Sequence, residues 1–192
     1  MQELVHHTIQ KLEELLGNFN KVQELYLSKS FDFDGRFEAF LSEFLEYLKT
    51  KGNTTYESEV LKVMNMVSTV KRGFNPMKME RISTGKRELL WGFSFSGMES
   101  IHGFLSEMYA KEKNKLEEAE ELLSGLVISL YQNGVLDDDK IKELNSVRHI
   151  EKFWTSLVNH NTQISGMNKK LRLTMISEDI FLVLEKMVVK LN

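Results

Sequence analysis

Apolar residues recur at three- and four-residue steps along most of the chain, and polar residues fill the positions between them. This pattern is typical of amphipathic α-helices, whose buried face returns every 3.6 residues. The longest such stretch runs from Ser96 to Gln132 and contains no proline. We therefore predict one long helix over about residues 96–132, around which the other helices pack.

Three shorter helices are predicted ahead of the long one. The first covers residues 4–27. The second follows Asp34, which has the residue type of an N-cap, and ends near Gly52. The third begins with Thr54 and Glu57, which have the spacing of a capping box.

The segment 86–95 has an ambiguous pattern. Trp91, Phe93 and Phe95 alternate as they do in a strand, whereas the residues before them do not. Strand and helix both stay open from the pattern alone, and the helical surroundings favour helix. Ser96 and Glu99 have the spacing of a capping box, so we expect the long helix to begin at residue 96.

After the long helix, the apolar residues of 138–191 follow a nearly heptad spacing. Polar Asn161 and Asn168 fall within this series. The pattern is compatible with one helix or with two, and a heptad seam is also typical of helices that associate with a second copy. Self-association through this segment is therefore expected.

Composition favours an all-helical protein. The 192 residues include one proline and are 42% hydrophobic, whereas sheet proteins need many turns and favour β-branched residues. We predict a single all-α domain over residues 1–192, a bundle of five to seven helices.

Cysteine usage and hydropathy restrict the location and the chemistry. The chain has no cysteine, which excludes disulfides, thiolate metal sites and cysteine nucleophiles and fits a reducing compartment. The first residues lack the basic and apolar regions of a signal peptide, and no run of eighteen apolar residues occurs. We expect a cytoplasmic protein without a membrane partner.

Charge is segregated along the chain despite a net charge of −3. Residues 62–87 carry 7 basic groups and 1 acidic group, so this segment either packs beside acidic helices or meets an acidic partner or a phosphate backbone. Residues 72–84 also lack clear periodicity, as a functional loop does. The basic candidates are Arg72, Lys78, Arg81, Lys86 and Arg87.

The segment Trp91–Gly103 combines aromatic and small residues. Small residues on one helix face permit the close approach of another helix or of a flat ligand. The helix crossing is the preferred interpretation. In the ligand interpretation, the pocket candidates are Trp91, Phe95, Met98, Glu99 and His102.

Motifs for common enzyme chemistry are absent or incomplete. Gly85-Lys86 lacks the other residues of a phosphate-binding loop. Glu-x-x-His occurs at Glu3–His6 and at Glu99–His102, but a di-metal bundle also needs glutamates from two further helices. We predict no catalytic residue, no metal site and no cofactor.

Three functions are compatible with the sequence. The preferred one is a non-enzymatic interaction or regulatory protein that acts through a helix surface or groove, with a protein partner or a second copy. The first alternative is a small-molecule or cofactor-binding bundle with a pocket beside residues 91–104. The second is nucleic-acid binding through residues 71–87, which the acidic total charge disfavours.

Overall fold

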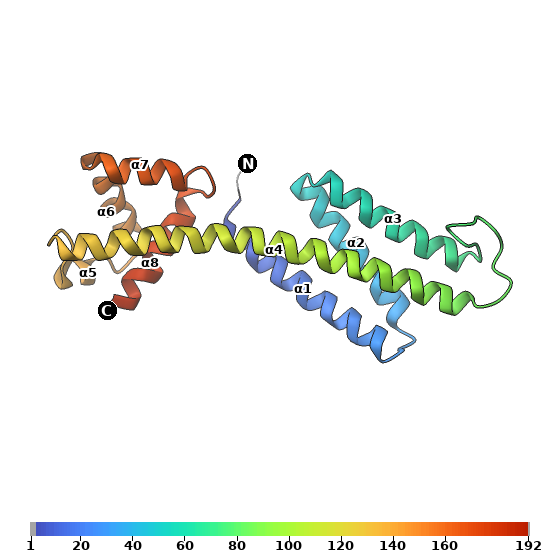
Figure 1. Ribbon diagram of the computed structural model, residues 1–192. Helices are drawn as coiled ribbons and strands as arrows, with labels where there is room; N and C mark the ends of the chain where they lie inside the picture. Colours follow the sequence, from blue (N-terminus) through green and yellow to red (C-terminus); the bar gives the residue numbers. More distant parts are fainter. Residues whose placement is uncertain (1–2, 192) are drawn as a thin grey trace. The chain divides into compact units, whose positions relative to one another are not determined.

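A computed structural model of the protein describes residues 3–191, and its regular structure is helical, as predicted. It has eight helices over these residues, where the sequence predicts five to seven. Their bounds, labelled in Figure 1, are α1 (Val5–Leu27), α2 (Phe33–Lys51), α3 (Thr54–Lys71), α4 (Lys86–Gln132), α5 (Asp138–Glu143), α6 (Val147–His160), α7 (Thr162–Leu171) and α8 (Ser177–Leu191).

The chain divides into two compact units. The amino-terminal unit is Leu12–Met108, and the carboxy-terminal unit combines the residues up to Lys11 with those from Tyr109 onward. Helices α1 and α4 contribute residues to both units. The single domain expected over the whole chain therefore stays a prediction, and each unit is described by itself.

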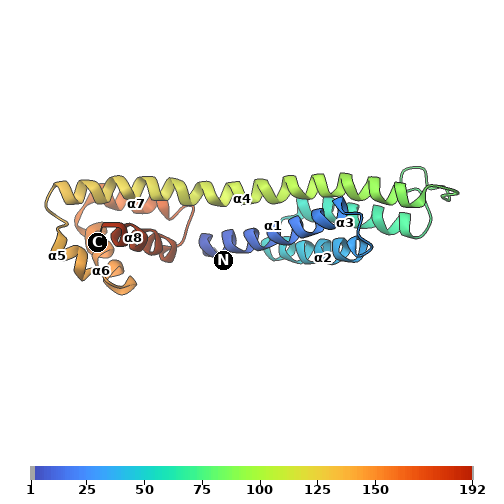
Figure 2. The ribbon, with the colours of Figure 1, turned by 90° about the horizontal axis from the view of Figure 1, so that it is seen from below.

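The amino-terminal unit is an antiparallel arrangement of α1, α2, α3 and the first part of α4 (Figure 2). Helix α1 continues through Gly17 without a break. Its buried positions keep the spacing of one helix face, and α2 faces it with aromatic residues, so the core is rich in phenylalanine. The fully buried large residues of α1 and α2 here are Leu12, Leu15, Phe19, Phe33, Phe37, Leu41, Phe44 and Leu48.

Two of the predicted helix starts are wrong, by two residues for α2, whose N-cap is Asp32, and by one residue for α3. Helix α2 begins at Phe33, so Asp34 lies inside its first turn. Helix α3 is capped by Asn53, whose side chain accepts a hydrogen bond from the Tyr56 N–H at 3.2 Å. The predicted end of α2 is confirmed, because Gly52 adopts the left-handed C-cap conformation with φ +64°.

The long helix begins ten residues earlier than predicted, at Lys86 instead of Ser96. Its buried face includes Leu90, Ser94, Gly97 and Ile101, which follow one another at three- and four-residue steps. Because two of these residues are small, the face does not stand out as apolar in the sequence. Ser96 is exposed in the helix interior and caps nothing.

Gly97 marks the close approach of α3 and α4. A Cβ atom added to Gly97 would lie 2.6 Å from Cγ1 of Val63, closer than two carbon atoms can pack. At Gly92 and Gly103, which also lie in α4, an added Cβ meets no atom within 4 Å. The helix-crossing interpretation of the small residues therefore holds at Gly97 and not along the whole face.

Replacing Gly97 by alanine should destabilise the protein by about 1–2 kcal/mol, because Val63 is stiff at χ1 and the helices must separate. Gly92→Ala is the matched control, and it should stabilise the protein by up to about 1 kcal/mol through helix propensity. The measurement is the free energy of unfolding in urea. Adding Val63→Ala to Gly97→Ala should restore part of the loss, and an equal effect at Gly92 and Gly97 would contradict the crossing.

The carboxy-terminal unit contains more helices than the one or two predicted for residues 138–191. The interruptions are made by capping side chains: Ser146 accepts from the His149 N–H, and Asn161 accepts from the N–H groups of Gln163 and Ile164. A new helix begins at each of these caps, although the apolar spacing alone suggests that one helix continues. The near-heptad series is thereby divided between α5, α6, α7 and α8.

The apolar residues of this series fill the core of their own unit. Trp154 is buried, and its indole N–H donates to Oδ1 of Asn168 at 3.1 Å, which explains one of the two polar residues in the series. These buried residues are used within their own unit and are not exposed as a seam, and self-association of the chain stays a prediction. The buried members of the near-heptad series include Ile141, Leu144, Ile150, Ile164, Leu171, Met175, Ile180 and Leu184.

Asp179, in the first turn of α8, is the fully buried carboxylate that holds the start of α1. Its oxygens accept from the backbone N–H of Val5 at 3.0 Å and of His6 at 3.3 Å, and Nδ1 of His6 lies 2.9 Å away. The first N–H groups of a helix have no partner within the helix. Burial acts to raise the pKa of Asp179, but the hydrogen bonds from His6 and the two N–H groups outweigh it and hold the pKa below its ordinary value.

Asp179→Asn should destabilise the protein by about 1–3 kcal/mol at neutral pH, since an amide cannot accept all of these bonds. Because the pKa of Asp179 is lowered in the folded state, the carboxylate stabilises the fold above the unfolded-state value near 3.8 and loses this effect as the pH falls through the folded pKa. The difference between wild type and variant should therefore shrink below that pH. Urea unfolding at several pH values tests this, with exposed Glu178→Gln as the control.

Candidate functional site

The pocket candidates on α4 lie in different surroundings. Trp91 and Phe95 join an aromatic cluster, Met98 is buried, and Glu99 and His102 are exposed. The His102 ring lies 5.8 Å from the Phe19 ring, centroid to centroid. A small-molecule site at these residues stays a prediction.

The aromatic cluster is centred on Tyr26 of α1. Its ring centroid lies 4.6 Å from that of Trp91, 5.2 Å from that of Phe33 and 6.0 Å from that of Phe95. The Tyr26 hydroxyl also donates to the carbonyl oxygen of Trp91 at 3.4 Å. These contacts give Trp91 and Phe95 a packing role between α1, α2 and α4.

The basic candidates are brought to one end of the amino-terminal unit, where α1 and α3 end and α2 and α4 begin (Figures 1 and 2). Arg72, Lys78 and Arg81 lie in the connection between α3 and α4, and Lys86 and Arg87 begin α4. All five side chains are exposed. Lys86 donates to the carbonyl oxygen of Lys71 at 2.8 Å, which satisfies the end of α3.

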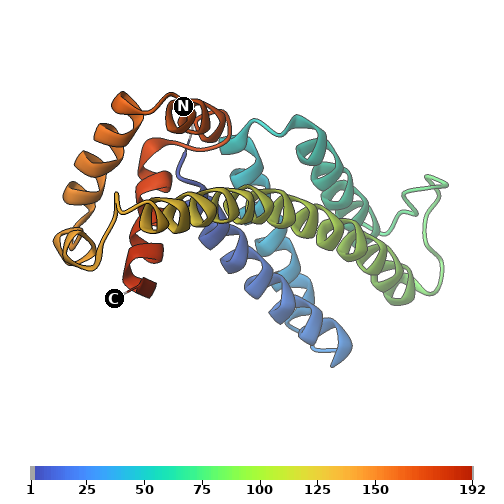
Figure 3. The ribbon, with the colours of Figure 1, turned by 60° about the vertical axis from the view of Figure 1, so that its left-hand side comes forward.

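The connection between α3 and α4, residues 72–85, is held as a short hairpin that stands out from these helices (Figure 3). Phe74 and Arg81 form an isolated antiparallel bridge, and the Asn75 side chain closes the turn. The loop is therefore an ordered scaffold. Its hydrogen bonds are Ile82 N–H to Gly73 O (2.8 Å), Asn75 N–H to Glu80 O (2.8 Å), Met79 N–H to Asn75 O (2.7 Å), Met77 N–H to Asn75 Oδ1 (2.9 Å) and Lys78 N–H to Asn75 Oδ1 (3.2 Å).

Large apolar side chains are exposed at the same end. Phe31 is 92% exposed, Leu27 is 78% exposed, and Met77 and Met79 are each 74% exposed. Together with Phe74 and the five basic candidates they form what we call the loop-end surface. In the sequence, these apolar residues are distinguished by lying outside the buried helix faces, and the charge pattern alone does not mark them.

Basic and apolar groups of the loop-end surface are in contact. The guanidinium of Arg87 lies 5.7 Å from the centroid of the Phe31 ring, and that of Arg81 lies 5.9 Å from the centroid of the Phe74 ring. These are cation–π distances. The surface therefore presents cations and apolar side chains together.

Two residues of this end have an uncommon backbone conformation. Lys29, in the turn between α1 and α2, has φ +54°, and Met79, in the hairpin, has φ +55°. Left-handed residues other than glycine cost energy and gather at functional sites. Both turns that carry the exposed apolar residues contain one.

A pocket of about 410 Å³ lies between α3 and the hairpin. Leu61 and Met66 line it from α3, and Pro76 and Met79 line it from the hairpin. We call it the α3–hairpin pocket. It is large enough for one apolar side chain, and one of its lining residues is the exposed Met79.

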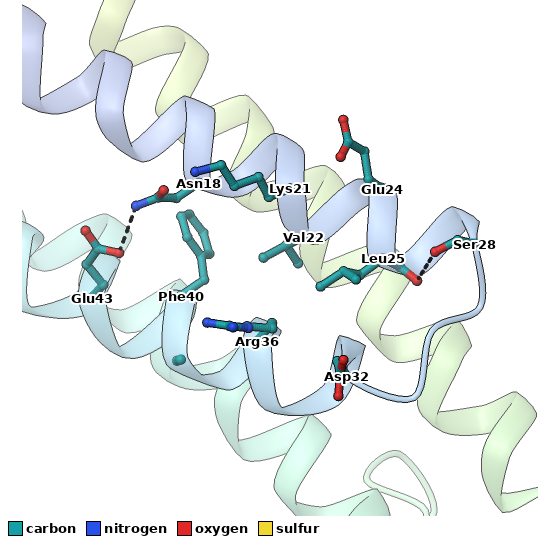
Figure 4. A pocket seen from close by; sticks show the side chains of 11 residues that line it. Asn18, Lys21, Val22, Glu24, Leu25, Ser28, Asp32, Arg36, Phe40 and Glu43 are labelled. Carbon is teal, nitrogen blue, oxygen red and sulfur yellow. Dashed lines mark hydrogen bonds between the residues drawn. The ribbon is translucent and has the colours of Figure 1, made fainter.

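A second concavity, of about 810 Å³, lies between α1 and α2 and is called the α1–α2 groove (Figure 4). Val22, Leu25 and Phe40 contribute its apolar residues. Lys21 and Arg36 lie on opposite walls. At one end, the Asn18 amide donates to Oε2 of Glu43 at 3.4 Å and joins the two helices.

Over residues 3–191, no group of three or more metal-binding side chains comes together, and no helix combines the length and apolar character needed to cross a membrane. Of the two Glu-x-x-His pairs, the first has His6 bound to Asp179, and the second has Glu99 and His102 exposed.

Comparisons of the chain with protein-family models, with curated proteins and with solved structures gave no match.

Tyr56 on α3 gives a test of the packing beside the candidate segment. Its ring stacks on Phe104 at 4.5 Å, and a hydrogen bond with Glu107 raises the pKa of Tyr56 to about 12. We expect this tyrosine to titrate later than an unperturbed one, whose pKa is 10.0. An ultraviolet titration of the wild type minus that of Tyr56→Phe isolates the group. Glu107→Gln should lower the pKa, and an unchanged titration in that variant would contradict the bond.

Proposed function

We propose that the protein is a non-enzymatic, cytoplasmic interaction protein that binds an acidic, amphipathic segment of another protein through its loop-end surface. The observation that carries this proposal is the exposure of Phe31, Met77 and Met79 beside a cluster of cations. Large contiguous apolar patches on a protein surface mark interaction sites, whereas single exposed apolar residues do not. Here Met77 and Met79 lie in the hairpin, and Phe31 lies in the turn between α1 and α2 beside Arg87, at the same end of the unit.

The cations favour an acidic partner. Arg72 and Lys78 make no ion pair with any residue that the structure describes. Exposed cations steer an acidic partner during association, and their effect depends on salt. The same charges also fit a phosphate backbone.

The apolar side chains favour a protein over a nucleic acid. Methionine is flexible and polarizable and adapts to varied apolar partners. Met77 and Met79 have neither a positive charge nor a hydrogen-bond donor in their side chains to bind a phosphate group. The α3–hairpin pocket adds a place for one apolar anchor residue of the partner. We therefore infer a partner segment with acidic residues next to a large apolar one.

The ordered hairpin supports a preformed binding surface. Its turn is closed by Asn75 and its strand-like bridge by Phe74 and Arg81. A surface already held in shape loses less conformational entropy when it binds. The left-handed conformation of Met79 fits the same role, because it sets the direction of an exposed side chain.

Selection of peptides from a random displayed library tests the proposal. We expect wild-type protein to enrich peptides in which Asp or Glu flanks a large apolar residue. Met77→Ser with Met79→Ser should weaken binding of a selected peptide about tenfold through lost apolar burial. Lys78→Glu with Arg81→Glu should weaken it by a similar factor, and more at low salt.

The matched control is Val189→Ser with Lys190→Glu on α8, which changes an exposed apolar residue and a cation outside the loop-end surface. It should leave peptide binding unchanged. Two arms test the other partners of a basic surface: vesicles that contain phosphatidylserine, and a DNA duplex. Tight binding to the vesicles or to the duplex that is lost in the same variants would overturn the proposal. Selected peptides that lack acidic residues would also overturn it.

A further inference from the structure

The α1–α2 groove carries charged groups that the loop-end surface does not use. Lys21 extends from α1 and Arg36 from α2, both toward the end that Asn18 and Glu43 close, and the ring of Phe40 lies between them (Figure 4). Neither cation forms a hydrogen bond or an ion pair with a residue that the structure describes. Two cations from opposite walls therefore face one space.

The acids of the groove do not neutralise this pair. Glu43 accepts the hydrogen bond of Asn18, Glu24 points away from α2, and Asp32 lies at the other end, next to the turn (Figure 4). None of the three is within ion-pair distance of Lys21 or Arg36. The groove thus has a cationic site although its total charge is not positive.

We infer that the α1–α2 groove binds an organic carboxylate with an apolar body. The carboxylate would lie between Lys21 and Arg36, and the body would lie against Leu25, next to the nearly buried Val22 and Phe40. A guanidinium and a carboxylate are matched in shape, because both are planar and can form two parallel hydrogen bonds. The volume of about 810 Å³ is within the usual range for small-molecule sites.

A monoanion fits this groove better than a phosphate dianion. Glu24, Asp32 and Glu43 all line it, so a second negative charge on the ligand would add repulsion without a further cation to balance it. The ligand chemistry is that of a carboxylate on an aromatic or aliphatic group. Its source is either a free small acid or the carboxyl terminus of a peptide.

Titration of the full chain with 3-phenylpropionate, followed by amide chemical shifts, tests this inference. We expect saturable shifts confined to residues 18–28 and 32–43. The neutral 3-phenylpropanamide, which has the same body, should bind at least about fivefold more weakly, the loss expected from one charge-assisted hydrogen bond. Equal binding of the amide would overturn the inference. It would also be overturned if neither 3-phenylpropionate nor a peptide with a free carboxyl terminus caused saturable shifts.

Variants assign the binding to the two cations. Lys21→Gln and Arg36→Gln should each weaken binding roughly three- to tenfold, as loss of an exposed charged contact does. Lys49→Gln is the control, because Lys49 is an exposed cation of α2 outside the groove. Equal effects at Lys49 and Arg36 would show nonspecific attraction and overturn the site.

A peptide arm separates the two sources. Short peptides ending in phenylalanine are compared with a free carboxyl terminus and with an amidated one. Binding of 3-phenylpropionate supports a small acid as the ligand, and binding of the free-terminus peptide alone supports a chain terminus. Neither result depends on the loop-end surface, since Met77→Ser with Met79→Ser should leave both unchanged.

Discussion

The close packing of α3 against α4 at Gly97 is the constraint on which the loop-end surface depends. A 2.6 Å approach between a Cβ at this position and Val63 leaves room for glycine alone. The crossing sets the separation of the two helices, and hence the distance between Lys71, where α3 ends, and Lys86, where α4 begins. The hairpin of residues 72–85 connects these two helix ends. The positions of its exposed methionines therefore depend on the separation of α3 and α4.

Helix positions could be predicted where large apolar residues mark the buried face, as they do in α1 and α2. The start of α4 could not, because Ser94 and Gly97 hold buried positions without being apolar. The breaks after residue 138 could not either, since they depend on polar caps such as Asn161, which a heptad pattern treats as interruptions of a seam. Local hydrogen bonding overrides hydrophobic periodicity at such points.

The basic residues of the loop-end surface could be predicted from the run of basic residues in the sequence, whereas its exposed apolar residues could not. A lone Phe31 or Met77 in a turn looks the same in the sequence whether it folds back onto the core or faces water. Only the folded chain shows that the turn between α1 and α2 and the hairpin share one end of the unit. The joint surface is a property of the antiparallel arrangement.

Buried polar groups and exposed apolar groups together indicate which parts of the chain serve the fold. Ser94 and Asp179 are the buried polar residues of the described chain; the first belongs to the tightly packed face of α4, and the second satisfies the first N–H groups of α1. Both stabilise the structure. Phe31, Met77 and Met79 bury little surface within the unit, and Met79 adds an unfavourable backbone conformation. Because these residues contribute little to the stability of the fold, their exposure is the observation on which the proposed binding role rests.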